Sequence, residues 1–198
     1  KSEILDEVEE FDSSVEAEIP DYPVTLFITK EGYLNKIRTA NLRMSGEQKV
    51  KEGDEVETTF ECSNKDELLV FTDKGQVYKA KVDDFPDGKA SQLGVYVAGK
   101  LEMDQDEKVI YICVIKEYVG YMIFVFENGK VAKVDISAYQ TKTNRKKLLK
   151  AYSLKSPLAC IEYIEEDCEL VLCSTSGRML ILNTGALTPK SSKDTIVV

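Results

Sequence analysis

A short phrase that returns four times constrains the fold of this 198-residue chain more than any other feature. In each copy, an apolar run meets a glycine turn and a second strand leaves it. The copies read VTLFITKEGYLNK at 24–36, LLVFTDKGQVYK at 68–79, MIFVFENGKVAK at 122–133 and LVLCSTSGRMLI at 170–181. The turn glycines Gly32, Gly75, Gly129 and Gly177 are separated by 43, 54 and 48 residues. Repetition at about 40–50 residues is typical of propellers and solenoids.

The four copies agree position by position when they are aligned on their glycines. The three residues that lie four to six before each glycine are all apolar, which predicts a strand buried on both faces. Glycine supplies the positive φ that a tight hairpin needs. Ten residues after each glycine comes a large apolar residue that we expect to fix the end of the outgoing strand: Leu42, Phe85, Tyr139 and Leu187.

The chain between the hairpins supplies the rest of each repeat unit. Each hairpin is followed by a variable polar excursion and then by one more apolar strand, which makes about four strands per unit if the excursion contributes one. A unit of this size cannot bury its apolar surface alone, so the units must pack side by side. We therefore predict an all-β, propeller-like disc of about four blades, with hairpins near 24–38, 67–81, 121–135 and 169–183.

Composition excludes several classes of protein. The chain is 43% hydrophobic and 31% charged, as in ordinary globular domains, and no apolar run is long enough for a membrane helix. The five cysteines show no CxxC spacing, which argues against a disulfide framework or a zinc site. There is no histidine, and so no histidine acid–base chemistry. No nucleophile motif, phosphate loop or metal cluster is visible, and we expect no catalytic residue and no metal site. Because the sequence begins at Lys1 without a methionine, we expect it to be a piece of a longer protein.

The net charge of −9 is concentrated at the start of the chain. Residues 1–22 hold nine acids and one base, or −8, which leaves 25 bases and 26 acids, or −1, in the remainder. We take 1–22 as an acidic connector and 23–198 as the repeat domain. The connector is interpreted as a solvated linker, with an acidic binding arm as the alternative.

Basic residues recur once per repeat. Lys36, Lys79 and Lys133 stand four residues after their glycines, Arg38 and Lys81 stand six after, and the excursions add further cations. Such clusters are often only solvated loops. Here they recur at one place per blade, so we expect them along one rim, where phosphates of a duplex could be neutralised. The predicted DNA-binding residues are Lys36, Arg38, Arg43, Lys79, Lys81, Lys89, Lys133, Lys142, Arg145, Lys146, Lys147 and Lys150.

The repeat resembles a known family. The phrases VTLFITKEGYLNKI and ELLVFTDKGQVYKAKVDDFPDG, together with the acidic lead KSEILDEVEEFDSSVEAEIP and the closing ALTPKSSKD, are similar to the C-terminal domain of bacterial type IIA topoisomerase A subunits. That family comprises the A subunits of DNA gyrase and topoisomerase IV. The resemblance covers essentially the whole chain.

The resemblance implies a fold and a role. It implies a β-pinwheel whose blades exchange strands, and a domain that binds and bends double-stranded DNA without catalysing a reaction itself. It further implies a cytoplasmic bacterial enzyme with no membrane association, in which other domains use ATP and Mg²⁺ and a B subunit completes an A2B2 assembly. The connector would lead to an upstream catalytic core, which carries the family's active-site tyrosine outside this chain.

Two departures from the family pattern matter. The glycine-rich basic box of gyrase A domains, QRRGGKG, is not matched by LRMSGEQKVKEG at 42–53 or elsewhere, which favours a topoisomerase IV-like or divergent gyrase domain. Four hairpins are also fewer than the five or six blades usual in the family, so either the chain is cut short or the disc is small or open. The alternative function is a propeller-like protein-interaction module with no DNA role. A propeller enzyme would need a central acidic or aromatic pocket, which the sequence does not reveal.

Overall fold

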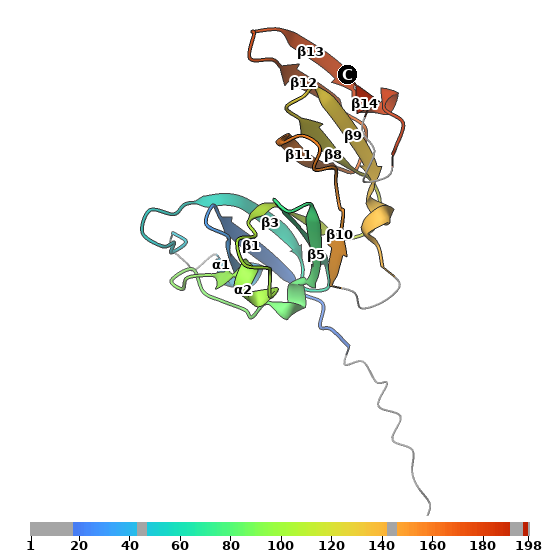
Figure 1. Cartoon of the computed structure of the whole chain (residues 1–198). Helices are drawn as coiled ribbons and strands as arrows, with labels where there is room; N and C mark the ends of the chain where they lie inside the picture. The colour runs from blue at the N-terminus through green and yellow to red at the C-terminus, as the bar shows by residue number, and fades with distance from the viewer. Residues whose placement is uncertain (1–17, 43–46, 142–145, 191–195, 198) are drawn as a thin grey trace, which may run out of the picture.

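The computed structural model describes residues 18–42, 47–141, 146–190 and 196–197, which form an all-β structure (Figure 1). Four antiparallel hairpins lie where the repeats predicted them: β1 (Pro23–Thr29) with β2 (Tyr33–Arg38), β4 (Glu67–Thr72) with β5 (Gln76–Lys81), β8 (Tyr121–Phe126) with β9 (Lys130–Asp135), and β12 (Glu169–Cys173) with β13 (Met179–Asn183). The four turn glycines have φ between +68° and +86°, a conformation that residues with a side chain rarely adopt.

The strands between the hairpins complete three of the sheets. The long connecting strands pair with the incoming strand of the hairpin before them: β3 (Val56–Ser63) with β1, β7 (Val109–Ile115) with β4, and β11 (Leu158–Ile164) with β8. The excursions also contribute short strands, namely β6 (Val95–Tyr96), β10 (Lys147–Leu149) and β14 (Ile196–Val197). The predicted four strands per sheet are therefore confirmed for the first three sheets.

Each excursion strand joins the sheet of the preceding hairpin, not its own. β6 follows the second hairpin but pairs with β2, β10 follows the third but pairs with β5, and β14 follows the fourth but pairs with β9. The sheet orders are β3-β1-β2-β6, β10-β5-β4-β7 and β11-β8-β9-β14, and β12-β13 stands as a sheet of two strands. In Figure 1 the orange β10 accordingly lies beside β5, away from its sequence neighbours β9 and β11. This exchange is the strand-swapped blade pattern that the resemblance implied.

Short helical turns end the strands. The α-helices α1 (Thr39–Leu42) and α2 (Val97–Lys100) have four residues each, and single 3-10 turns follow β5, β9 and β13 at Val82–Asp84, Ile136–Tyr139 and Thr184–Ala186. The apolar residues predicted to fix these strand ends are buried at Phe85, Tyr139 and Leu187.

The core lies between successive hairpins. Residues on one side of each hairpin, which we call its forward face, pack against the next hairpin along the chain, and residues on the opposite side form its rear face. Leu26, Ile28 and Leu34 on the forward face of the first hairpin share a buried cluster with Leu68 and Val70 on the rear face of the second. The same arrangement joins the second hairpin to the third and the third to the fourth. The second and third hairpins thus present apolar residues at alternate positions to two different neighbours, which is why their strands read as continuous apolar runs.

The fourth hairpin was predicted to be buried on both faces, but only its rear face is buried. Its rear-face residues Leu170, Leu172 and Leu182 pack against the third hairpin, but Val171 on its forward face is 57% exposed. The first and fourth hairpins lie at opposite ends of the molecule (Figure 1), and no strand pair joins them among the described residues. The described sheets therefore form an open series, not a closed disc.

The strand exchange requires close backbone packing at Gly94, just before β6, and this requirement can be tested. A Cβ atom there would lie 2.6 Å from the carbonyl carbon of Leu34 in β2, where backbone cannot give way. We expect Gly94→Ala to lower the free energy of unfolding by about 1–3 kcal/mol, because β6 must shift away from β2. The matched control is Gly99→Ala in α2, where the nearest atom would be 3.5 Å away. Urea denaturation should show that control to be neutral or slightly stabilising, and equal losses in both variants would contradict the argument.

Candidate nucleic-acid interface

The repeated lysines lie inside the packing between blades. Lys36 is 2% exposed, and its Nζ lies 2.8 Å from Asn64 Oδ1 and 3.1 Å from Asp87 Oδ1. Asn64 belongs to the turn between β3 and β4, which leads into the second hairpin. Lys36 therefore ties the first hairpin to the chain entering the second.

The other two copies repeat this contact with different partners. Lys133 is 3% exposed and donates to Asp167 Oδ1 at 2.7 Å and to the Thr184 carbonyl at 2.9 Å. Lys79 lies 3.5 Å from Glu67 Oε2, and its Nζ is 5.3 Å from the centre of the Tyr118 ring. Like Asn64, Asp167 and Tyr118 lie in the turns that lead into the following hairpins. We call these three lysines with their partners the blade latches.

The prediction that these lysines form part of an exposed basic stripe is wrong for Lys36 and Lys133. Both are buried and each is paired with a carboxylate, so neither presents a charge to a phosphate. Lys79 is 14% exposed in its side chain and is also paired. Residues two apart on a strand do share a face, but here that face meets the next sheet and not the solvent.

Arg38 is exposed but joins the first latch. Its Nε lies 2.6 Å from Asp87 Oδ2, and its guanidinium carbon lies 4.2 Å from the centre of the Tyr22 ring. Tyr22 also donates its hydroxyl to Asp87 at 3.0 Å. Burial would raise the pKa of Asp87, but hydrogen bonds from Arg38, Lys36 and Tyr22 outweigh it and lower the pKa below its usual value. At the third latch, hydrogen bonds from Lys133 and Thr184 lower the pKa of Asp167 in the same sense.

The excursions place exposed cations at one recurring position. Each excursion returns to the outgoing strand of the preceding hairpin and bonds to its backbone at the latch lysine. Gly88 N donates to the Lys36 carbonyl, Lys190 N donates to the Lys133 carbonyl, and Lys79 N donates to the Lys146 carbonyl, each at 2.7 Å. The exposed Lys146 and Lys190, and the exposed Lys89 one residue after Gly88, therefore lie beside three successive sheets. No salt bridge involves these three side chains among the residues that the structure describes.

The remaining predicted residues fall into three groups. Lys81 and Lys150 are exposed. Lys147 is half-buried, with its Nζ 2.6 Å from Asp104 Oδ2 and 5.4 Å from the centre of the Tyr78 ring, and the bond to Asp104 raises its pKa. Arg43, Lys142 and Arg145 lie outside the described residues.

Sequence reasoning missed Lys190 and left Lys49 out of the predicted set. Lys49 donates its backbone N–H to the Ala90 carbonyl at 2.7 Å, which brings the first excursion beside Lys89 of the second. Lys190 follows Gly177 by 13 residues, the same spacing as Gly88 from Gly75, so alignment on the turn glycines places it one residue before the position of Lys89.

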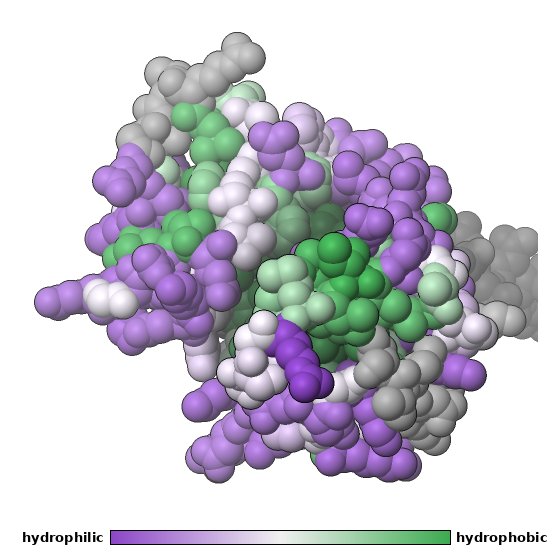
Figure 2. Space-filling model, turned by 90° about the horizontal axis from the view of Figure 1, so that it is seen from above, coloured by the Kyte–Doolittle hydropathy of each residue, from purple (hydrophilic) through white to green (hydrophobic). Residues whose placement is uncertain are grey.

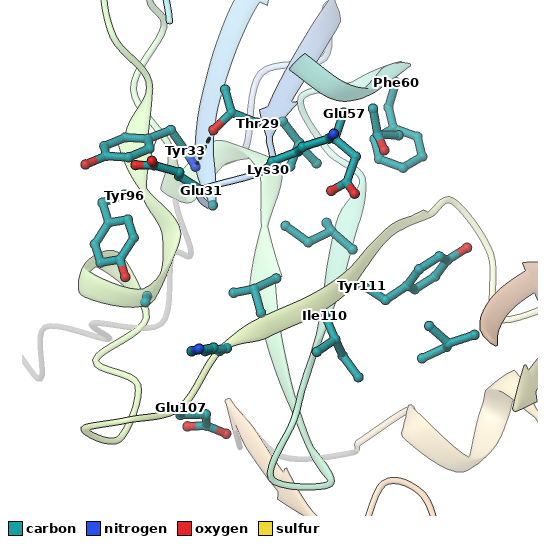
Figure 3. Close-up of a pocket in the computed structure, with 18 of the residues that line it drawn as sticks. Thr29, Lys30, Glu31, Tyr33, Glu57, Phe60, Tyr96, Glu107, Ile110 and Tyr111 are labelled. Carbon is teal, nitrogen blue, oxygen red and sulfur yellow. Dashed lines mark hydrogen bonds between the residues drawn. The ribbon is translucent and has the colours of Figure 1, made fainter. Parts of the chain in front are cut away.

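A hollow of about 860 Å³ lies between the tip of the first hairpin and β7 (Figure 3). It is lined by both aromatic and acidic residues, as a propeller enzyme would require, including Tyr33 and Tyr96 with ring centres 5.3 Å apart. Some of its charged groups have structural partners. Lys51 lies 2.8 Å from Glu31 Oε2, and the buried Glu107 accepts from the Tyr78 hydroxyl at 2.8 Å. Glu57 and Glu162 also line the hollow, and burial raises the pKa of Glu162. No cluster that could hold a metal ion is found among the described residues.

Comparisons with known proteins agree with this architecture. The family model described as "DNA gyrase C-terminal domain, beta-propeller" matches residues 66–112. The chain is 29% identical over 159 residues to the A subunit of DNA topoisomerase 4 from Bacillus subtilis (strain 168), covering 78% of this chain and 20% of that protein. It is 27% identical over 187 residues to the Staphylococcus aureus protein of the same name, covering 91% of this chain and 23% of that protein. The chain thus spans about a fifth of the length of these relatives.

Solved structures show the same fold. The crystal structure of the C-terminal domain of DNA topoisomerase IV superposes with a TM-score of 0.75 at 25% identity, covering 88% of this chain and 56% of that one. The C-terminal domain of E. coli ParC gives 0.67 at 18% identity, covering 87% and 69%. The DNA gyrase A C-terminal domain gives 0.55 at 16% identity, covering 86% and 58%. The predicted resemblance and the propeller-like fold are confirmed. Within the described residues, no helix is long and apolar enough to span a membrane.

The first blade latch predicts acid-sensitive stability. The pKa of Asp87 is lowered in the folded protein, so its stabilising contribution is present above the unfolded pKa of about 3.9 and is lost as the pH falls through the folded value. We expect Asp87→Asn to lower the free energy of unfolding by about 1–3 kcal/mol at pH 7. The difference from the unchanged protein should shrink below about pH 4. The exposed Glu117→Gln is the control for loss of one negative charge, and urea titrations at both pH values make the measurement. A difference that persists at low pH would refute the ionic account.

Proposed function

We propose that this chain is the DNA-binding C-terminal domain of a bacterial type IIA topoisomerase A subunit, and that it binds duplex DNA without sequence preference. The observation that carries the proposal is that each of the first three sheets has beside it an exposed lysine that makes no salt bridge among the described residues. Lys89, Lys146 and Lys190 each lie beside the outgoing strand of a successive blade. Point charges in a regular series suit phosphate neutralisation along a duplex, and contacts to the backbone alone carry no base specificity.

The proposed DNA-binding set differs from the one that the sequence suggested. The latch lysines Lys36, Lys79 and Lys133 hold the blades together, and the excursion cations contact DNA. The exposed Lys49, Lys81 and Lys150 extend the set, and the excursion residues Arg43, Lys142 and Arg145 stay predicted contacts.

The parent protein is proposed to be an ATP-dependent type II topoisomerase in the bacterial cytoplasm. The names of the relatives and the higher TM-score of the topoisomerase IV domain favour a topoisomerase IV-like parent, as the missing QRRGGKG box also does. In this proposal the domain bends or guides DNA for decatenation or supercoiling and performs no chemistry itself. ATP and Mg²⁺ would act through other domains, and a B subunit would complete an A2B2 assembly.

The salt dependence of DNA binding tests the proposal. If about six phosphates are neutralised, affinity for a random-sequence duplex should fall roughly a thousandfold between 50 and 200 mM salt. The combined reversal Lys89→Glu, Lys146→Glu and Lys190→Glu should reduce the slope of log K against log salt by about 3, because three phosphate contacts are lost. Fluorescence anisotropy with a labelled duplex gives both quantities.

Two controls separate this result from a general charge effect. Lys74→Glu, Lys108→Glu and Arg178→Glu change the net charge equally at exposed positions near the hairpin turns, and should leave most of the slope intact. Lys133→Met removes a latch and should lower the melting temperature while keeping the slope in the folded protein. Two results would favour a protein-interaction module instead. One is that the chain does not bind duplex DNA, and the other is that the two triple-reversal variants bind it equally well.

A further inference from the structure

The hollow beside the first hairpin lies at an internal joint, by which we mean the contact between two successive hairpins (Figure 3). The two sheets that meet there are complete, with strand orders β3-β1-β2-β6 and β10-β5-β4-β7. Apolar side chains also gather at the end of the molecule that carries the fourth hairpin (Figure 2), but that surface faces outward. The hollow, of about 860 Å³, has the size of a ligand site.

The joint between the second and third hairpins shows how the chain fills such a space. Tyr152 is 5% exposed there, and its ring stacks on that of Phe124 with 5.3 Å between the ring centres. The Tyr152 hydroxyl donates to the Thr72 carbonyl at 2.7 Å, at the end of β4. Phe71 packs edge-on against Phe124, with ring centres 5.9 Å apart. Three aromatic rings therefore pack together at this joint.

Ala98 is the counterpart of Tyr152 at the joint between the first and second hairpins. Val97 N donates to the carbonyl of the turn glycine of the first hairpin at 2.9 Å, and Ala151 N donates to that of the second hairpin at 2.8 Å. Ala98 and Tyr152 are the next residues along the chain. A methyl group therefore stands where the following joint has a phenol ring, and Ala98 lines the hollow.

The other two ring positions also carry smaller side chains at the first joint. Alignment on the turn glycines places Ile28 at the position of Phe71, and Val70 at the position of Phe124. The carbonyl that accepts from the tyrosine hydroxyl has its counterpart in Thr29, and both Ile28 and Thr29 line the hollow. The first joint thus keeps the acceptor for a phenol hydroxyl and lacks the ring.

The charges around the hollow favour a cation. Its lining holds four carboxylates and three ammonium groups, and one ammonium group, that of Lys30, pairs with Glu55 outside the lining. Glu57 and Glu162 form no salt bridge in the part of the chain that the structure describes. Tyr96, which is 49% exposed, adds an aromatic face to which a cation can bind. A net negative site attracts basic groups and repels phosphates, which disfavours a nucleotide.

We propose that this hollow binds the side chain of a tyrosine that lies in a basic segment of a partner protein. The phenol ring enters between Ala98 and Thr29 and donates its hydroxyl to the Thr29 carbonyl, as Tyr152 does to Thr72 within the chain. Basic residues on either side of the tyrosine meet Glu57 and Glu162. The site is independent of DNA binding, because no lysine of the proposed DNA-binding set lines it.

An NMR titration of the isotope-labelled whole chain with the peptide acetyl-Lys-Tyr-Lys-amide tests the proposal. The amide resonances of Thr29, Tyr96 and Ala98 should shift and approach saturation by about 10 mM peptide, while that of Tyr152 stays in place. Acetyl-Lys-Phe-Lys-amide, which lacks the hydroxyl, should bind about fivefold more weakly. Acetyl-Lys-Leu-Lys-amide, which lacks the ring, should give no saturable shift at these amides.

Variants of the chain separate the site from a general charge effect. Ala98→Tyr should fill the hollow from within, raise the melting temperature and weaken the tyrosine peptide about tenfold or more. Val119→Tyr adds the same ring at a 58% exposed position outside the lining, and should leave peptide binding unchanged. Glu57→Lys, at an exposed position, should weaken acetyl-Lys-Tyr-Lys-amide and favour acetyl-Glu-Tyr-Glu-amide. This charge exchange decides the matter even if Ala98→Tyr does not fold.

Three results would overturn the proposal. The first is the lack of a saturable shift at the hollow with the tyrosine peptide. The second is equal binding of the tyrosine and leucine peptides, or equal binding of the tyrosine peptide to the unchanged chain and to folded Ala98→Tyr. The third is a short oligothymidylate that shifts the same amides more readily than the peptide, which would assign the hollow to unpaired bases instead.

Discussion

The packing of one hairpin face onto the next is the constraint on which the structure depends. A two-stranded hairpin cannot bury its side chains alone, so each hairpin relies on its neighbours along the series. Leu69 and Phe71 face the third hairpin, while Leu68 and Val70 face the first. The strand exchange strengthens the same connection, because β6 and β10 bind each blade to chain that comes from the next one. Neighbouring blades are therefore joined by apolar contact and by backbone hydrogen bonds together.

A latch lysine is the polar exception within this packing. A buried ammonium group is costly unless it is paired and hydrogen-bonded. Asp87 and Asp167 supply the charge, and Asn64 Oδ1 and the Thr184 carbonyl supply further oxygen atoms. The latch therefore fixes the position of the following hairpin, and the charge it uses is withdrawn from any role at the surface. Charge for a nucleic-acid partner must come from the excursions, which vary in length and lie outside the core. That division is expected for a repeat fold, where the scaffold is constant and the loops carry function.

The hairpins were predictable because their signals are local. Four glycine turns with flanking apolar runs fix the strand positions within a residue or two. The destination of the excursion strands was not predictable, because β6 and β14 have two residues each and no periodicity can show itself over such a length. Their pairing is decided by residues more than fifty positions away. The burial of Lys36 did leave a signal in the sequence. Lys36 lies on the same face of the hairpin as the apolar residues Leu26 and Leu34, and a lysine on an apolar face belongs to the interior. The basic-stripe interpretation considered only which charges share a face, and not what else lies on it.

The same comparison of the residues on each hairpin face distinguishes the two ends of the described series. On the rear face of the first hairpin, the chain replaces apolar residues with Thr25 and Asn35 and covers them with its own excursions. On the forward face of the fourth, it replaces the latch lysine with Ile181 and leaves the surface uncovered. Each substitution runs against the repeat, and the two run in opposite directions: one removes apolar surface and the other removes a charge. The rear face of the first hairpin is therefore a polar surface that the chain's own excursions cover, whereas the forward face of the fourth keeps the apolar pattern by which one hairpin packs on the next.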